Sequence, residues 1–409
     1  MVKFIKSLSV VFCLISVAVF SVIIYGTRSI PDEIVLVSDK AVSSSNLFTF
    51  EKTGENYRAN SPESVDGGGY RVNVSLLNII PVKTSTVHIS RRHYVVPGGE
   101  IFGLKMYSKG VMVVATGAVE TAGGSQNPAL QAGLEAGDII VSINGETVNE
   151  STRVSQLFRE SNGEPMNVTV AKNGKIYETV FSPALSSTEG IYKAGLWIRD
   201  SAAGIGTITY YDENAGVYGS LGHAVCDVDT NSIIPILSGE AVKARITGCY
   251  KGVNGRAGEL CGVFSGGTLG SILINGETGV YGFMKRVSIP DKDILPVATK
   301  SEVALGKAQI ISTVDSEKPE YYNIEITKIF KNGDSVRNMC IKVTDPVLTE
   351  KTGGIVQGMS GSPIIQNGML VGAVTHVFIN DSLRGYAIFA ENMLDTSDTL
   401  YEYALEEAS

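Results

Sequence analysis

The sequence has no block of lysine or arginine residues, and acidic residues outnumber basic ones. Its 34 Lys and Arg stand against 42 Asp and Glu, which gives a formal net charge of −8 at pH 7. Proteins that bind nucleic acid gather cations on one face to neutralise phosphates. We therefore expect no nucleic-acid partner.

Cysteine is also scarce, and its spacing matches no metal-binding framework. The nearest approach to a ligand pair is His223 with Cys226, which lacks the second nearby pair that a structural zinc site uses. We expect no metal and no cofactor, and we interpret the five cysteines as buried free thiols, namely Cys13, Cys226, Cys249, Cys261 and Cys340.

Long charge-rich helical patterns are missing too, whereas glycine is abundant. The chain has 45 glycines and many short runs of Val, Ile, Thr and Tyr, which is typical of strands joined by tight turns. From residue 190 to about 400 such runs recur at intervals of roughly 10 to 15 residues, as expected for a barrel or sandwich. The predicted fold class is mainly β.

One long apolar run is present, at the N-terminus. Lys3 and Lys6 precede an uncharged stretch over Ser7–Gly26, about the length that crosses a bilayer as a helix. The positive charges place the N-terminus in the cytoplasm and the remaining residues outside. No cleavage signal of small residues follows, so we predict an uncleaved signal anchor over 1–26 and not a removed secretory signal.

A polar region follows the anchor. Over 27–68 the sequence is irregular and turn-rich, with a serine triplet at 43–45, which predicts a linker. Over 70–89 alternating apolar residues predict one or two strands. We therefore assign 27–92 to a linker and to the strands that lead into the folded part.

Two folded domains are expected after that region. The first, over 93–185, alternates strand-like runs with a helical pattern at Ser151–Glu160, where Ser151 is a plausible cap. A Ser/Thr/Gly segment after Pro183 marks the boundary. The second domain covers 186–409 and holds the recurring short strands.

The sharpest local feature of the second domain is the turn Gly358-Met359-Ser360-Gly361. Acyl transfer needs a nucleophilic hydroxyl beside N–H groups that stabilise an oxyanion. A glycine at 358 allows a conformation that aims the N–H groups of Gly358 and Ser360 at one point, and Gly361 leaves room for a substrate backbone. An ordinary glycine-rich hairpin turn is the alternative.

A nucleophilic serine needs a base, and the chain has only four histidines. His88 and His93 lie before or at the edge of the first folded domain. His223 lies in a small-residue loop between β-prone segments, where a histidine is readily held at the edge of a cleft. His376 lies in an alternating strand, where a packed or surface histidine is usual. His223 is therefore the preferred base and His376 the alternative.

The carboxylate that would orient the base is less determined by pattern. Asp227, Asp229, Asp345 and Asp381 are all candidates. Asp345 ends a strand-like run and precedes Pro346, a position from which a carboxylate can point into a cleft. Choosing it gives the order His, Asp, Ser, which is the chymotrypsin order and agrees with a β-rich domain.

These motifs resemble the stage IV sporulation protein B peptidases of endospore-forming bacteria, which are chymotrypsin-like, double-barrel serine proteases with an N-terminal anchor and a PDZ domain. The resemblance covers nearly the whole chain, and its most specific parts are SLGHAV around His223 and the stretch over 342–368. It implies a triad of His223, Asp345 and Ser360, with an oxyanion hole at Gly358 and Ser360. In the wider superfamily the triad aspartate usually lies closer to the histidine, whereas Asp345 is only fifteen residues before Ser360.

The same resemblance identifies the segment over 132–145 as the PDZ signature. Its pattern L-x-x-G-D-x-I-x-x-I-N-G suits a tight turn, a strand and an Asn-Gly turn. It implies that the loop over 97–104 offers N–H groups to a peptide carboxylate and that the following strand pairs with the peptide. The expected peptide-binding residues are Gly99, Ile101, Phe102, Gly103 and Leu104. A purely structural module is the alternative.

The resemblance also implies a role that neither spacing nor composition indicates. Members of the family are made in the forespore, cross its inner membrane, act between the two forespore membranes and cleave themselves near the N-terminus. They then cut the extracytoplasmic part of a membrane-bound regulator of an intramembrane metalloprotease, which lets a sigma factor mature. Expected partners are thus protein substrates, the protein itself and the membrane.

Two other functions compete with this interpretation. One is a membrane-anchored PDZ scaffold that binds peptides without cutting them. The other is a carboxyl-ester hydrolase with the same serine, which is disfavoured because the β-α alternation of the α/β-hydrolases is missing.

Overall fold

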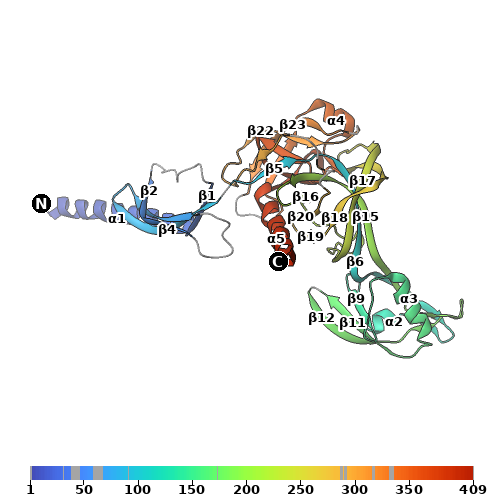
Figure 1. Cartoon of the computed structure of the whole chain (residues 1–409). Coiled ribbons are helices and arrows are strands. Elements are labelled where there is room, and N and C mark those ends of the chain that lie inside the picture. The colour runs from blue at the N-terminus through green and yellow to red at the C-terminus, as the bar shows by residue number, and fades with distance from the viewer. Residues whose placement is uncertain are drawn as a thin grey trace. The chain divides into compact units, whose positions relative to one another are not determined.

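The computed structural model describes residues 2–30, 32–37, 47–58, 68–90, 92–172, 174–285, 289, 293–315, 318–330 and 336–408. The chain forms two compact units, Met1–His93 and Tyr94–Ser409, and Figure 1 shows the elements of each. Helix α1 spans Val2–Ser29. Its part from Ser9 to Ser29 is long and apolar enough to cross a membrane, a property that signal sequences share.

The first unit also contains a small sheet. Its strands lie in the order β1-β4-β3-β2, and the sheet buries Phe48, Val74 and Leu76 against Val19 and Val22 of α1. One face of the apolar helix is therefore covered where it meets the sheet. The strands are β1 (Glu33–Val37), β2 (Phe48–Arg58), β3 (Gly68–Leu76) and β4 (Ile80–Ser90).

This sheet corrects the expectation of a linker. β1 and β2 lie within 27–68, where an irregular segment was predicted. The strands expected over 70–89 are present as β3 and β4, but they pair with β1 and β2 and belong to the first unit. The serine triplet at 43–45 lies outside the described residues.

The second unit begins with a half-barrel built from long antiparallel strands. Alternating side chains such as Phe102, Met106, Ile208, Tyr218 and Ile272 point inward and form its core. β6 pairs with β15 on one side and with β17 on the other. The strands are β5 (Tyr94–Pro97), β6 (Ile101–Thr116), β15 (Leu196–Asp212), β16 (Val217–Ser220), β17 (Ile236–Tyr250), β18 (Gly258–Ile272), β19 (Ile274–Gly276) and β20 (Gly279–Phe283).

A second, smaller core is inserted between β6 and β15. It packs Val113, Ile140, Val154, Phe158 and Phe181 together, and β6 and β15 run side by side from the half-barrel into it (Figure 1). Its elements are β7 (Val119–Thr121), β8 (Gly124–Gln126), α2 (Pro128–Gln131), β9 (Ile139–Ile143), β10 (Glu146–Thr147), α3 (Ser151–Glu160), β11 (Met166–Lys172), β12 (Lys175–Phe181), β13 (Ala184–Leu185) and β14 (Tyr192–Lys193).

The end of the chain forms a closed barrel. β22, β23, β24, β28, β27 and β26 hydrogen-bond in a ring around apolar side chains that include Ile310, Ile324, Ile341 and Val374. The elements are β21 (Leu295–Pro296), β22 (Gly306–Ser312), β23 (Glu320–Ile329), β24 (Met339–Val343), α4 (Pro346–Thr352), β25 (Val356–Gln357), β26 (Pro363–Gln366), β27 (Met369–Phe378), β28 (Asp381–Phe389) and α5 (Ala390–Ala408). The predicted mainly β fold with an apolar N-terminal helix and two barrel-like halves is confirmed.

The segment over 99–104 is not where the sequence placed it. Ile101–Leu104 begin β6 in the half-barrel, with β15 bonded on one side and β17 on the other, so no edge is open to a peptide. Phe102 is fully buried against Tyr218, and the N–H of Gly99 donates to the carbonyl of Ile208. The prediction of a peptide-binding loop at Gly99, Ile101, Phe102, Gly103 and Leu104 is therefore wrong.

The cysteines differ from expectation only in burial. All five are free, but Cys340 alone is buried; Cys13 is exposed and the remaining three are half-buried.

Candidate active site

The turn that carries Ser360 is held by two threonine hydroxyls of β15. Thr207 Oγ1 donates to the carbonyl of Gly358 over 2.9 Å, and Thr209 Oγ1 donates to the carbonyl of Gly361 over 2.8 Å. Gly358 and Gly361 have φ of +96° and +94°, a region that favours glycine. Within the described chain no hydrogen bond uses the N–H of Gly358 or Ser360. Both N–H groups are thus left available for a ligand, as an oxyanion hole requires.

Gly361 has a different role from the one expected. A Cβ atom at this position would lie 2.1 Å from the carbonyl oxygen of Thr207 and 2.5 Å from the nitrogen of Leu221. The glycine therefore lets the turn approach the backbone of the neighbouring elements, and does not serve mainly to make room for a substrate.

His223 follows a bend that glycine makes possible. Leu221 and Gly222 both have positive φ, of 65° and 72°, and the imidazole Nδ1 lies 2.8 Å from the carbonyl oxygen of Ala224. Because a carbonyl only accepts, Nδ1 must carry the proton in this contact, which leaves Nε2 as an acceptor. Burial lowers the pKa of His223, although the bond to Ala224 partly offsets that effect.

Ser360 and His223 line one cleft of about 800 Å³, together with Gly358 and His376. The ring centroids of His223 and His376 lie 4.8 Å apart. Both candidate bases therefore lie at the cleft, and their positions alone do not show which one acts on Ser360. Ser360 Oγ donates to the carbonyl of Thr375 over 2.8 Å. The cleft wall is otherwise mostly apolar and includes Leu104, Ile205, Leu221, Val225, Ile355 and Val377.

Asp345 is not among the residues that line this cleft, and both of its carboxylate oxygens accept hydrogen bonds from other groups. Its Oδ1 accepts from the N–H groups of Val347 and Leu348, which makes it the N-cap of α4, and its Oδ2 accepts from the backbone and side-chain amides of Asn323. Burial raises its pKa, but the bonds from Asn323, Leu348 and Val347 outweigh burial and hold the pKa below the ordinary value. No hydrogen bond joins Asp345 to His223 within the described residues, so the expected orienting contact is missing from this geometry.

Two parts of the chain match known protein families. Residues 190–394 match the SpoIVB peptidase S55 family. The chain belongs to this family. The match includes the whole turn around Ser360 as well as His223, and it makes the protein a serine peptidase, as the resemblance implied. A PDZ domain matches over 121–172, which is the core inserted between β6 and β15.

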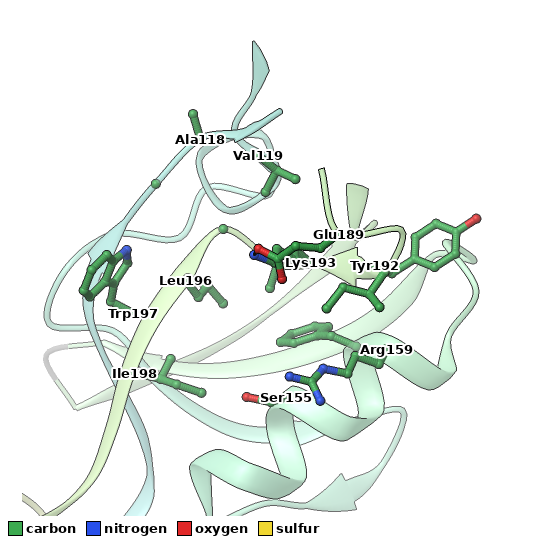
Figure 2. A pocket seen from close by; sticks show the side chains of 15 residues that line it. Ala118, Val119, Ser155, Arg159, Glu189, Tyr192, Lys193, Leu196, Trp197 and Ile198 are labelled. Atoms are coloured by element: carbon green, nitrogen blue, oxygen red, sulfur yellow. Dashed lines mark hydrogen bonds and ion pairs between the residues drawn. The ribbon is translucent and has the colours of Figure 1, made fainter. Parts of the chain in front are cut away.

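A second hollow in this S55 peptidase lies in its PDZ domain, beside α3. It has a volume of about 450 Å³, and Figure 2 shows Leu196, Trp197 and Ile198 of β15 on one side with Ser155 and Arg159 of α3 on the other. Over this stretch β6 is the only strand paired with β15 among the described residues. An open strand edge beside a helix is the arrangement in which a peptide adds to a sheet.

Sequence reasoning missed this groove, although a signal for it exists. The run Ala194-Gly195-Leu196-Trp197 joins a glycine turn to the start of a strand. Gly195 has a φ of +64° and lines the hollow together with Ala194. The glycine-rich loop over 97–104 has the same appearance and lies where a PDZ domain with the usual strand order would begin. The order of elements in this domain, which only the structure reveals, decides between the two loops.

Proposed function

We propose that this S55 peptidase is an endopeptidase of sporulation signalling in which Ser360 is the nucleophile and His223 the general base. The N–H groups of Gly358 and Ser360 supply the oxyanion hole. One observation carries the proposal: the glycine turn, whose N–H groups at Gly358 and Ser360 bond to no other described residue, lines the same cleft as a histidine of defined tautomer, inside the region matched by the family.

The reaction begins with a rotation of the serine side chain. Ser360 Oγ turns from the carbonyl of Thr375 to Nε2 of His223, which accepts its proton as the oxygen attacks the scissile carbonyl. The negative charge that develops on the carbonyl oxygen is stabilised by the N–H groups of Gly358 and Ser360. The imidazolium then protonates the leaving amine, and water hydrolyses the acyl-enzyme by the reverse sequence of proton transfers.

The carbonyl of Ala224 takes the place that a carboxylate has in the chymotrypsin triad. It fixes the tautomer of His223 but carries no full negative charge, so it stabilises the imidazolium less. Asp345 remains the triad member that the family resemblance implies, and its capping bonds must break before it can approach His223.

The PDZ domain would hold a substrate before it is cut. PDZ domains bind extended peptides at a strand edge, and the groove between α3 and the start of β15 offers such an edge with Trp197 exposed beside it. The proposed peptide-binding site therefore moves from the loop over 99–104 to Leu196–Ile198.

The finer biological role is proposed on the family alone. The substrates are the extracytoplasmic part of a membrane-bound regulator of an intramembrane metalloprotease and the N-terminal region of the enzyme itself. The site of action is the space between the two forespore membranes, with α1 as the anchor until self-cleavage releases the enzyme. Mass spectrometry of the wild-type protein and of the Ser360→Ala variant, each made in a host without the active enzyme, tests self-cleavage. Shortening of the variant at the same positions would assign the cut to another protease.

Catalysis itself is tested at two neighbouring serines. Ser360→Ala should abolish hydrolysis and labelling by a fluorophosphonate while the protein stays folded, because the hydroxyl lies at the cleft and makes one hydrogen bond to the described residues. Ser362 is the matched control, since its buried hydroxyl donates to Ser312 and does not line the cleft. An active Ser360→Ala protein beside an inactive Ser362→Ala protein would move the nucleophile, and an unlabelled wild type would favour the non-cutting scaffold.

A further inference from the structure

One arginine ties β15 to the loop that follows the candidate base. Arg199 donates to Asp227 through Nη1 and to Asp229 through Nη2, the latter over 2.8 Å. It lies on β15 directly after the groove residue Ile198, and together with Asp227 it lines the same cleft as His223 and Ser360. The register of β15 against β6 shifts between Arg199 and Ser201, and such an irregularity re-aims side chains locally.

The two ends of this contact differ in burial. The side chain of Asp227 is fully buried, whereas that of Arg199 is 36% exposed. Asp227 Oδ1 accepts from the N–H groups of Asp229 and Thr230 and from the Thr230 hydroxyl. For Oδ2, Arg199 is the only hydrogen-bond donor in the described part of the chain. Without Arg199 a buried carboxylate oxygen would lose its charged partner, which is a costly state.

Asp227 in turn shapes the segment that holds His223. Its carbonyl and N–H close the turn over 227–232 by bonds with Asn231 and Ser232. Asn275 of β19 also holds this segment: its side-chain oxygen accepts from the N–H of Val225, and its side-chain nitrogen donates to the carbonyl of Val225. The segment after His223 is therefore anchored at two places, one neutral and one ionic.

The carbonyl that fixes the histidine lies inside this anchored segment. The carbonyl of Ala224 is hydrogen-bonded to Nδ1 of His223, and Ala224 directly precedes Val225 in the chain. Any shift of the turn at Asp227 moves this carbonyl and with it the direction of Nε2. Burial raises the pKa of Asp227, but the bonds from Thr230 and Arg199 outweigh burial and keep the pKa low, so the carboxylate stays charged and able to hold the arginine.

We propose that Arg199 is a positioning residue for catalysis: through Asp227 it holds the 224–232 segment in the conformation that presents His223 to Ser360. The inference rests on the proposed function, because Arg199 can position the base only if His223 is the base. It adds a residue outside the triad, on the strand that also lines the PDZ groove.

The test measures the rate at which a fluorophosphonate labels Ser360, together with kcat and KM for a short peptide, in the full chain. Arg199→Ala should slow labelling and lower kcat on the order of 10- to 100-fold, the usual effect of a misplaced catalytic group, with KM within about twofold. Arg199→Lys should recover part of the rate, because it keeps one charged donor for Asp227.

A matched arginine controls for the loss of an ion pair as such. Arg153 bridges Glu146 and Glu160 on the PDZ domain, and its side chain is also 36% exposed. Arg153→Ala should label at the wild-type rate. In addition, Arg199→Ala combined with Asp227→Asn should be no slower than Arg199→Ala alone, since the arginine acts through the aspartate.

The possible results separate the two proposals. A wild-type labelling rate in Arg199→Ala, equal slowing in Arg153→Ala, or multiplied losses in the double variant would each overturn the positioning role. If Arg199→Ala does not fold, Arg199→Lys decides: a reduced rate supports the role and an unchanged rate overturns it. An unlabelled wild-type protein would overturn the proposed function itself and this role with it.

Discussion

The hydroxyl of Thr207 provides a way to test the oxyanion turn without touching the cleft. Thr207→Val keeps the shape of the side chain and removes the 2.9 Å bond to the carbonyl of Gly358. A hydrogen bond of this kind contributes about 1 kcal/mol net, and the same free energy corresponds to about a fivefold change in a rate or population. We therefore expect kcat for a short peptide to fall about three- to tenfold.

The effect should appear in kcat and leave KM nearly unchanged. The Gly358 N–H is needed when charge develops on the substrate oxygen, so its displacement weakens binding of the transition state more than that of the substrate. Thr179→Val is the control, because Thr179 Oγ1 makes the same kind of bond over 2.7 Å to the carbonyl of Ala132 in the PDZ domain. Both variants should lose about 1 kcal/mol of unfolding free energy in urea.

The reasoning fails if kcat is unchanged. A Thr207→Val protein with reduced stability and wild-type kcat would show that the turn keeps its conformation without the hydroxyl. Equal losses of kcat in Thr207→Val and Thr179→Val would point to a general effect of stability and would equally refute a local role.

Three further predictions concern the same site. Because burial lowers the pKa of His223, activity should persist to lower pH than a free imidazole allows and then fall when His223 is protonated. The free energy of unfolding should also decrease below about pH 6.5, because the unfolded state takes up the proton first. A pH-rate profile with an inflection above about pH 6.5 would contradict this prediction. Asp345→Asn should place an amide against the donors of Asn323 and cost about 1–3 kcal/mol of stability, and it should lower kcat by about a thousandfold or more because the triad carboxylate is lost; a folded variant with wild-type kcat would leave Asp345 with the capping role alone. Gly361→Ala should inactivate the enzyme because its Cβ would lie 2.1 Å from a backbone oxygen, whereas Gly368→Ala has open space at a similar φ and should cost only about 1 kcal/mol in thermal unfolding.

Local sequence signals predicted the glycine turn around Ser360 and the helix of the inserted domain. Gly358 and Gly361 have the positive φ that such a turn needs, and α3 has the expected bounds of Ser151–Glu160 with Val154 and Phe158 buried. These features depend on residues close together in the chain. The expected cap at Ser151 is wrong, because Glu150 holds the N-cap position without a side-chain bond and Ser151 is the first helical residue. The N–H and hydroxyl of Ser151 donate instead to the carboxylate of Asp200, 49 residues further along the chain.

Two residues lie elsewhere than the sequence pattern indicated, for different physical reasons. Asp345 followed by Pro346 is a typical N-cap with proline in the first turn, so its capping role was visible in the sequence; its place in the triad stays a prediction. Phe102 could not be placed by pattern, because an alternating strand looks the same at a sheet edge and between two partners. Only the pairing of β6 with both β15 and β17 decides that question.

The insertion of the PDZ domain between β6 and β15 has a consequence for how the enzyme is made. The first strands of the half-barrel leave the ribosome before residues 110–195, and their partner β15 follows only afterwards, roughly 4 to 17 s later at usual rates of synthesis. The PDZ domain has its own apolar core, to which the start of β15 also contributes, so its folding brings the two strands together at little entropic cost. Substitutions in the PDZ core should therefore lower the yield of assembled peptidase during translation, even where the finished enzyme would cut normally.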